Sequence, residues 1–129
     1  MEIKRISAAG GGYSDVVAID EGRLRWLYVA GQTARGNPVR DDLGAQAEMC
    51  LTQLETLLDA WGAGLENVVR MTTYLTDLSE YGAFAQARKR HFGSEPPSST
   101  AIEISALLDN RLIEIDAVAV VPRASTTTD

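Results

Sequence analysis

The sequence predicts an α+β fold in which one mixed β-sheet carries two helices on one face. Apolar residues recur at steps of three and four over residues 42–61 and again over residues 79–92, which indicates two amphipathic helices. Six other segments alternate apolar and polar residues, the pattern of strands with one buried face. The resulting order is β-β-β-α-β-α-β-β, so each helix is expected to cross over between two parallel strands.

The first three strands follow one another closely along the chain. They are predicted at Glu2–Ile6, Asp15–Ile19 and Leu24–Ala30, and the turn Asp20-Glu21-Gly22 joins the last two as a hairpin. An antiparallel meander is therefore expected to begin the fold.

The first helix has the clearest periodicity in the chain. Its apolar stripe consists of Leu43, Ala47, Cys50, Leu51, Leu54, Leu58 and Trp61. Either Asp41 or Asp42 is a suitable N-cap, and Gly62 and Gly64 are suitable stops because glycine accepts left-handed dihedral angles. Since Cys50 lies on the apolar stripe with no histidine placed to form a dyad, it is expected to pack as a small hydrophobic residue.

The second half of the chain alternates strands with the second helix. Strands are predicted at Val68–Asp77, Thr100–Leu107 and Leu112–Val121, and the turn Asp109-Asn110 predicts that the last two form a hairpin. Ser79 is the predicted N-cap of the helix. The helical stripe consists of Tyr81, Phe84, Arg88 and His91, with Ala85 and Phe92 beside it. The basic run at residues 88–90 predicts a solvated face.

The face of the sheet that lies opposite the helices is expected to be mixed in character. Its predicted members are Val68, Arg70, Thr72, Tyr74, Leu112, Glu114, Asp116, Val118 and Val120. Such a surface is too apolar to be left in water and too polar for a core. We therefore expect it to contact other subunits.

Three carboxylates are predicted to gather on this face. Glu114 and Asp116 share one side of their strand, and Glu103 is expected to face them from the partner strand. Such a cluster can retain a proton on one member and act as a general acid or base. It is equally consistent with a sheet edge neutralised by Arg70 and Arg111.

Length and charge limit the classes of function. The 129 residues correspond to one domain, expected over residues 1–123, with a polar tail at 124–129. A net charge of −6 disfavours nucleic acid as a partner. No signal peptide or membrane span is expected, and a single cysteine fits a reducing compartment, so the predicted location is cytoplasmic.

Metal and cofactor chemistry are not expected. One histidine, His91, and one cysteine, Cys50, provide no ligand cluster at zinc or iron spacing. His91 lies at the end of a helix and is interpreted as structural. The three glycines at residues 10–12 lack the Gly-Lys-Ser/Thr that a phosphate loop requires, so a flexible turn is predicted there.

Five motifs in order resemble one known family over almost the whole chain. They are Gly-Gly-Gly-Tyr13-Ser14, Val29-Ala30-Gly31-Gln32, Asn67-Val68-Val69-Arg70, Tyr74-Leu75-Thr76-Asp77-Leu78 and Ile113-Glu114-Ile115-Asp116-Ala117-Val118-Ala119. Together they resemble the Rid family, also called YjgF or L-PSP endoribonuclease. The resemblance implies a chorismate-mutase-like α+β fold and a homotrimer whose sheets form a central barrel. It also implies three clefts at subunit boundaries.

The resemblance further implies a chemistry and a set of site residues. Well-known members hydrolyse 2-imino acids without cofactor or metal, using an arginine that binds the substrate carboxylate and a glutamate that orients water. Glu114 matches that glutamate, and Tyr13 and Gly31 match the cleft tyrosine and glycine. The arginine position, fifteen residues before the glutamate, falls on Ser99, and a cysteine position two residues further falls on Ala101.

Three functions remain open at this point. The first is hydrolysis of an imine or enamine by Glu114, with Ser99 and the backbone near Gly31 binding the ligand. The second is a non-catalytic ligand-binding or regulatory trimer, favoured by the missing arginine and by Ala85 at a position that is often asparagine. The third, endoribonuclease activity, is weakened by the acidic charge. Arg35 or Arg111 could replace the missing guanidinium from a neighbouring subunit.

Overall fold

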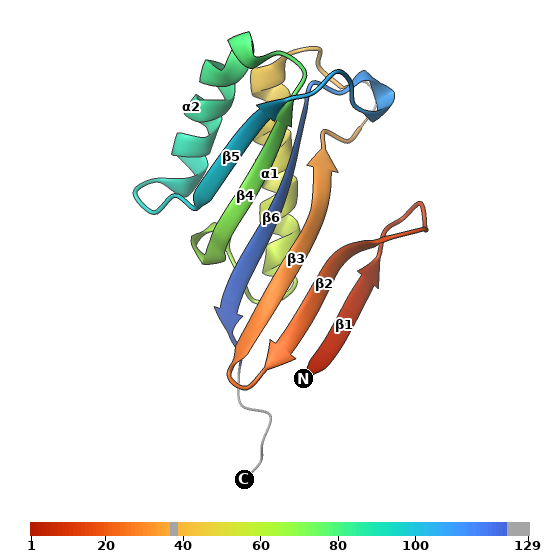
Figure 1. Ribbon diagram of the computed structural model, residues 1–129, viewed down its shortest axis with the longest axis vertical. Helices are drawn as coiled ribbons and strands as arrows, with labels where there is room; N and C mark the ends of the chain where they lie inside the picture. The colour runs from red at the N-terminus through yellow and green to blue at the C-terminus, as the bar shows by residue number, and fades with distance from the viewer. Residues whose placement is uncertain (37–38, 124–129) are drawn as a thin grey trace.

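The computed structural model describes residues 1–36 and 39–123, and the polar tail predicted at 124–129 lies outside the described residues. Figure 1 shows a six-stranded mixed sheet with the order β1-β2-β3-β6-β4-β5. The strands are β1 (Glu2–Ser7), β2 (Ser14–Glu21), β3 (Leu24–Thr33), β4 (Val68–Leu75), β5 (Ser98–Glu103) and β6 (Ile113–Pro122). The α-helices are α1 (Leu43–Asp59) and α2 (Tyr81–Phe92). The predicted element order is confirmed.

The connections explain why the sheet is mixed. Strands β1, β2 and β3 form the predicted antiparallel meander, and Gly22, with φ of 59°, makes the turn between β2 and β3. Strands β4 and β5 are parallel, with α2 as their crossover. Because β3 and β4 both pair antiparallel with β6, they run parallel to each other, and α1 connects them. Both expected crossovers are confirmed.

The predicted hairpin between the last two strands is wrong. Strand β5 pairs with β4 at the edge of the sheet, whereas β6 lies between β3 and β4. Residues Asp109 and Asn110 do turn the chain, with φ of 57° and 54°, but they return it to the centre of the sheet. Burial accounts for this order, because Ile113 and Ile115 of β6 are fully buried there, whereas β5 is largely exposed.

One core joins the sheet to both helices. Figure 1 shows α1 behind the sheet, and its Leu51, Leu54 and Leu58 are fully buried in one cluster with Phe84 of α2 and Met71 of β4. Apolar burial of this kind is the main stabilising contribution to a fold of this size. Within the described residues, neither α-helix has the length and apolar content needed to span a bilayer.

Helix ends follow the predictions in part. The Asp42 carboxylate accepts hydrogen bonds from the first turn of α1, at 2.9 Å from the Gly44 nitrogen, which confirms one of the two predicted N-caps. Gly62 takes a φ of 73° just past the helix, whereas Gly64 is extended. Asp77, not Ser79, caps the turn that leads into α2, because its side chain accepts the Ser79 backbone N–H at 2.9 Å.

The open face of the sheet, opposite the helices, is more apolar than predicted. A bulge between Val68 and Arg70 turns Val68 into the core and leaves Val69 47% exposed, the reverse of the expectation. On β3, Trp26 and Tyr28 point outward beside Val120 and Val118 of β6. We call the patch formed by Trp26, Tyr28, Val118 and Val120 the open-face patch. A contiguous surface of this kind is typical of an interface.

Candidate functional site

Glu114 lies on the open face of β6, between two strands that shape its surroundings. It is paired with Thr33 of β3 on one side and with Tyr74 of β4 on the other. Strand β3 bulges between Val29 and Gln32, which brings Gly31 against the glutamate. A Cβ atom at Gly31 would lie 2.7 Å from Cδ of Glu114, so a side chain at this position would displace the carboxylate from where it lies.

The surroundings of Glu114 shift its pKa upward. Burial, together with the negative charge of Asp116 on the same face, raises the pKa of Glu114 above its ordinary value. The Tyr74 hydroxyl donates a hydrogen bond to Oδ2 of Asp116 at 3.1 Å, and burial and this bond raise the pKa of Tyr74. The predicted shared face of Glu114 and Asp116 is thus confirmed, and the role of Glu114 as a general acid or base stays a prediction.

Glu103 does not belong to this cluster. It lies at the end of β5 opposite Leu75, a fully buried residue of the core, so it is on the helix side of the sheet. Its carboxylate accepts the backbone N–H of Leu78 at 2.9 Å. The expectation failed because it assumed that β5 and β6 pair.

The arginines expected to neutralise the cluster make other contacts. Arg70 donates to the hydroxyls of Ser98 and Thr100 on the edge strand. Arg111 donates through Nε to the Ala34 carbonyl at 2.7 Å. Among the described residues neither forms an ion pair with Glu114 or Asp116, so the interpretation as a neutralised sheet edge is not supported.

Arg35 is also engaged elsewhere. Its guanidinium lies 3.6 Å from Oδ1 of Asp15 and donates to the side chain of Gln32 at 3.2 Å. Arg35 therefore has an acidic neighbour of its own within the chain.

The remaining predicted site residues are not gathered around Glu114 within one chain. Tyr13 lies in the loop between β1 and β2, and the residue is 59% exposed. Ser99 pairs with Met71, and Ala101 with Thr73, so both side chains are on the helix side of β5. Because successive side chains of a strand alternate between faces, Ser99 and Glu114 are on opposite sides of the sheet.

A residue that the sequence analysis did not select contacts Ser99. Nη1 of Arg88 donates to Oγ of Ser99 at 3.1 Å, and Nη2 donates to the Tyr81 hydroxyl at 2.8 Å. The same guanidinium lies over the ring of Phe84, 4.9 Å from its centroid. The prediction of a solvated face is therefore wrong for Arg88. The helical stripe of Tyr81, Phe84 and Arg88 was the signal in the sequence that could have identified it.

These contacts form one wall of a groove between α2 and the edge strand. The groove has a volume of about 610 Å³, and its walls include Tyr81, Ala85, Arg88, Phe92, Pro97 and Ser99. We call it the Arg88 groove.

The other reactive side chains are structural, as predicted. Cys50 is fully buried in α1, and burial raises the pKa of its thiol to about 12, so no thiolate forms near neutral pH. His91 contacts a carboxylate oxygen of Glu48 and so joins α2 to α1. In the described part of the chain, no three His, Cys, Asp or Glu side chains are placed to hold a metal ion.

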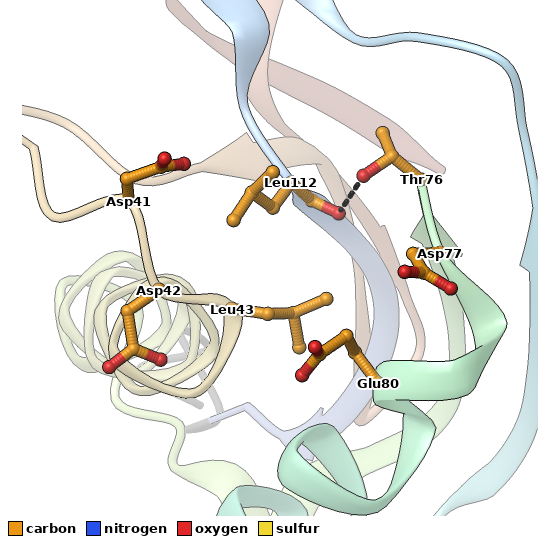
Figure 2. A pocket seen from close by; sticks show the side chains of 7 residues that line it. All are labelled: Asp41, Asp42, Leu43, Thr76, Asp77, Glu80 and Leu112. Carbon is orange, nitrogen blue, oxygen red and sulfur yellow. Dashed lines mark hydrogen bonds between the residues drawn. The ribbon is translucent and has the colours of Figure 1, made fainter.

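A second pocket is strongly acidic. Its volume is about 460 Å³. Figure 2 shows Asp41, Asp42, Asp77 and Glu80 around it, next to the hydrogen bond from Thr76 to the Leu112 carbonyl. Two of these carboxylates already cap helical turns, since Asp42 accepts from α1 and Asp77 from the turn before α2. Helix capping therefore accounts for much of this cluster.

Comparisons with known proteins agree with the fold. A family model described as Endoribonuclease L-PSP matches residues 2–121. The chain is 36% identical over 112 residues to Protein DfrA of Myxococcus xanthus, covering 85% of this chain and 86% of that protein. It is 33% identical over 117 residues to the 2-iminobutanoate/2-iminopropanoate deaminase of Capra hircus, covering 88% and 82%.

A solved structure is similar throughout. It is a Mycobacterium tuberculosis protein described as a member of the YjgF/YER057c/UK114 family, with a TM-score of 0.79, 32% sequence identity, and coverage of 93% of this chain and 100% of that one. The fold and the site thus define an α+β protein with a glutamate on the open face of a mixed sheet. The chain belongs to the Endoribonuclease L-PSP family, also called the Rid or YjgF family.

Proposed function

We propose that this protein is a homotrimer that binds small metabolites in clefts between subunits and hydrolyses imines or enamines there. The observation that carries the proposal is the contact between Glu114 and Gly31. It places a partly buried carboxylate with a raised pKa directly against the backbone of the β3 bulge. The named activity of the relative from Capra hircus supports this class of substrate.

The proposed reaction needs only water and a carboxylate. Glu114 accepts a proton from a water molecule while the water oxygen bonds to the imine carbon and the C=N π pair moves to nitrogen. Glu114 then gives this proton to that nitrogen, which completes a carbinolamine. In the second step Glu114 accepts the hydroxyl proton as the carbonyl forms and the C–N bond breaks, and it passes that proton to the leaving nitrogen to form ammonia. One water is consumed and one ammonia is released. A base with a raised pKa suits both transfers.

The open-face patch supports the proposed trimer, because its Trp26 and Tyr28 remain substantially exposed in the single chain. Tyr28→Glu places a charge beside Val118 and is expected to convert trimer to monomer, because a buried unpaired charge is costly. Light scattering would report the loss of a particle of three times 13.9 kDa. Met49→Glu, on an exposed site of α1, is the matched control and should leave the trimer intact. A trimeric Tyr28→Glu variant would contradict this placement of the interface.

The activity is tested by following ammonia and 2-oxo acid release from freshly generated 2-iminopropanoate and 2-iminobutanoate. The native protein is expected to accelerate release above the spontaneous rate, in proportion to protein concentration. If it binds 2-oxo acids but leaves the rate unchanged, the protein is a non-catalytic ligand-binding trimer. The resemblance that places Ser99 at the family's arginine position favours that second function.

A further inference from the structure

We propose that the Arg88 groove is a binding site for small organic carboxylates, in which Arg88 binds the carboxylate group and the groove walls contact an apolar tail. This proposal rests on the proposed function. The groove would be the part of the intersubunit cleft that selects 2-imino acids over uncharged imines. A guanidinium thus reaches this region from a helix, although the edge strand offers only the hydroxyl of Ser99.

The charge of the groove is the first support for this proposal. Arg88 and Lys89 both line it, and its lining residues include no aspartate or glutamate. Among the described residues no carboxylate pairs with Arg88, whereas Arg90 of the same helix pairs with Glu48. A partly buried guanidinium without an acidic partner favours an anionic ligand, because a carboxylate would supply the missing charge.

The geometry of Arg88 is the second support. The Tyr81 hydroxyl and Oγ of Ser99 hold the two terminal nitrogens, and the rings of Phe84 and Tyr81 lie 4.9 and 5.6 Å from the guanidinium carbon. The side chain is therefore positioned before a ligand arrives, which lowers the entropic cost of binding. A guanidinium presents five N–H donors in a fixed plane, so two hydroxyl contacts leave donors for a carboxylate.

The walls of the groove set the kind of tail. Ala85, Phe92, Pro96 and Pro97 provide apolar contacts, and a volume of about 610 Å³ is in the range of small-molecule sites. The acidic pocket of Figure 2 would repel the same ligand, since four carboxylates line it. The preferred ligand is consequently a short aliphatic carboxylate.

The test is calorimetric titration of the native trimer with 2-oxobutanoate, its methyl ester and inorganic phosphate. We expect the acid to bind, and the ester and phosphate to bind at least tenfold more weakly. Arg88→Gln is expected to weaken 2-oxobutanoate binding by roughly tenfold to a hundredfold, the typical loss for a charge-assisted hydrogen bond. Arg90→Gln, which removes the same charge from a residue paired with Glu48, should bind normally.

A second variant separates loss of binding from loss of structure. Arg88→Gln combined with Ser99→Arg returns a guanidinium to the groove from the edge strand and is expected to recover most of the lost affinity. The proposal would be overturned if the native protein and Arg88→Gln bound 2-oxobutanoate with equal affinity. It would also be overturned if the native protein bound the methyl ester or phosphate as tightly as it binds 2-oxobutanoate.

The two proposals fail in different ways. Imine hydrolysis by the native protein with unchanged binding in Arg88→Gln would refute only the role of Arg88. Binding that depends on Arg88 in a protein that hydrolyses no imine would refute only the proposed catalysis.

Discussion

Glu114→Gln is expected to lower the rate of imine hydrolysis by about a hundredfold to ten-thousandfold, the usual contribution of a positioned general base. Glutamine keeps the shape of the side chain and therefore its contact with the Gly31 backbone, but it cannot accept a proton from water. Initial rates of 2-oxo acid release from 2-iminobutanoate measure the loss. Glu55→Gln, an exposed change on α1, is the control for altered net charge.

The pH profile identifies the group responsible. A general base must be ionised, so kcat/KM of the native protein should fall as pH decreases through the pKa of Glu114. Because burial and Asp116 raise that pKa, the fall should be centred above the ordinary glutamate value of 4.5. The residual rate of Glu114→Gln should lack this acidic limb. A native profile that stays flat down to pH 4.5, or a variant that keeps the limb, would assign the base to another residue.

At a substrate concentration far below KM, mixed trimers of Arg88→Gln and Glu114→Gln are expected to reach about one third of the native activity, whereas the parent trimers keep about a tenth to a hundredth and about a hundredth or less. Arg88 contacts Ser99 on the helix side of the edge strand, whereas Glu114 is on the open side of β6, with β4 between the two strands. One small ligand cannot contact both within a chain, so a complete cleft would combine Arg88 of one subunit with Glu114 of its neighbour. In a closed ring of three, any mixed composition leaves one cleft in three with both residues intact.

Co-expression with two different affinity tags and purification through both isolates the mixed trimers. The control is a trimer in which every subunit is Glu114→Gln and the two tags are on different subunits. This control should stay inactive. Recovery in the mixed trimers would show that the site is shared between subunits. Activity no higher than that of the parents would mean that both residues act within one chain, or that they do not act together.

Local periodicity accounts for the parts of the fold that sequence analysis predicted correctly. The stripe of α1 from Leu43 to Leu58 is buried as expected, because helical spacing alone places those residues on one face. The shared face of Glu114 and Asp116 follows equally from the two-residue repeat of a strand. The order of the strands was not predicted, since the place of β6 between β3 and β4 depends on which pairing buries more apolar surface.

The sequence by itself determined the family, the two helices, the approximate positions of the strands and the chemical identity of Glu114, all of which depend on local spacing and residue type. The tertiary structure decided which groups meet. It separated Glu103 from Glu114, turned Val68 inward at a bulge and placed Arg88 against Ser99 across the turn that joins α2 to β5. Each of these contacts joins two different secondary-structure elements. They depend on how whole helices and strands pack against one core, and local residue spacing does not determine that packing.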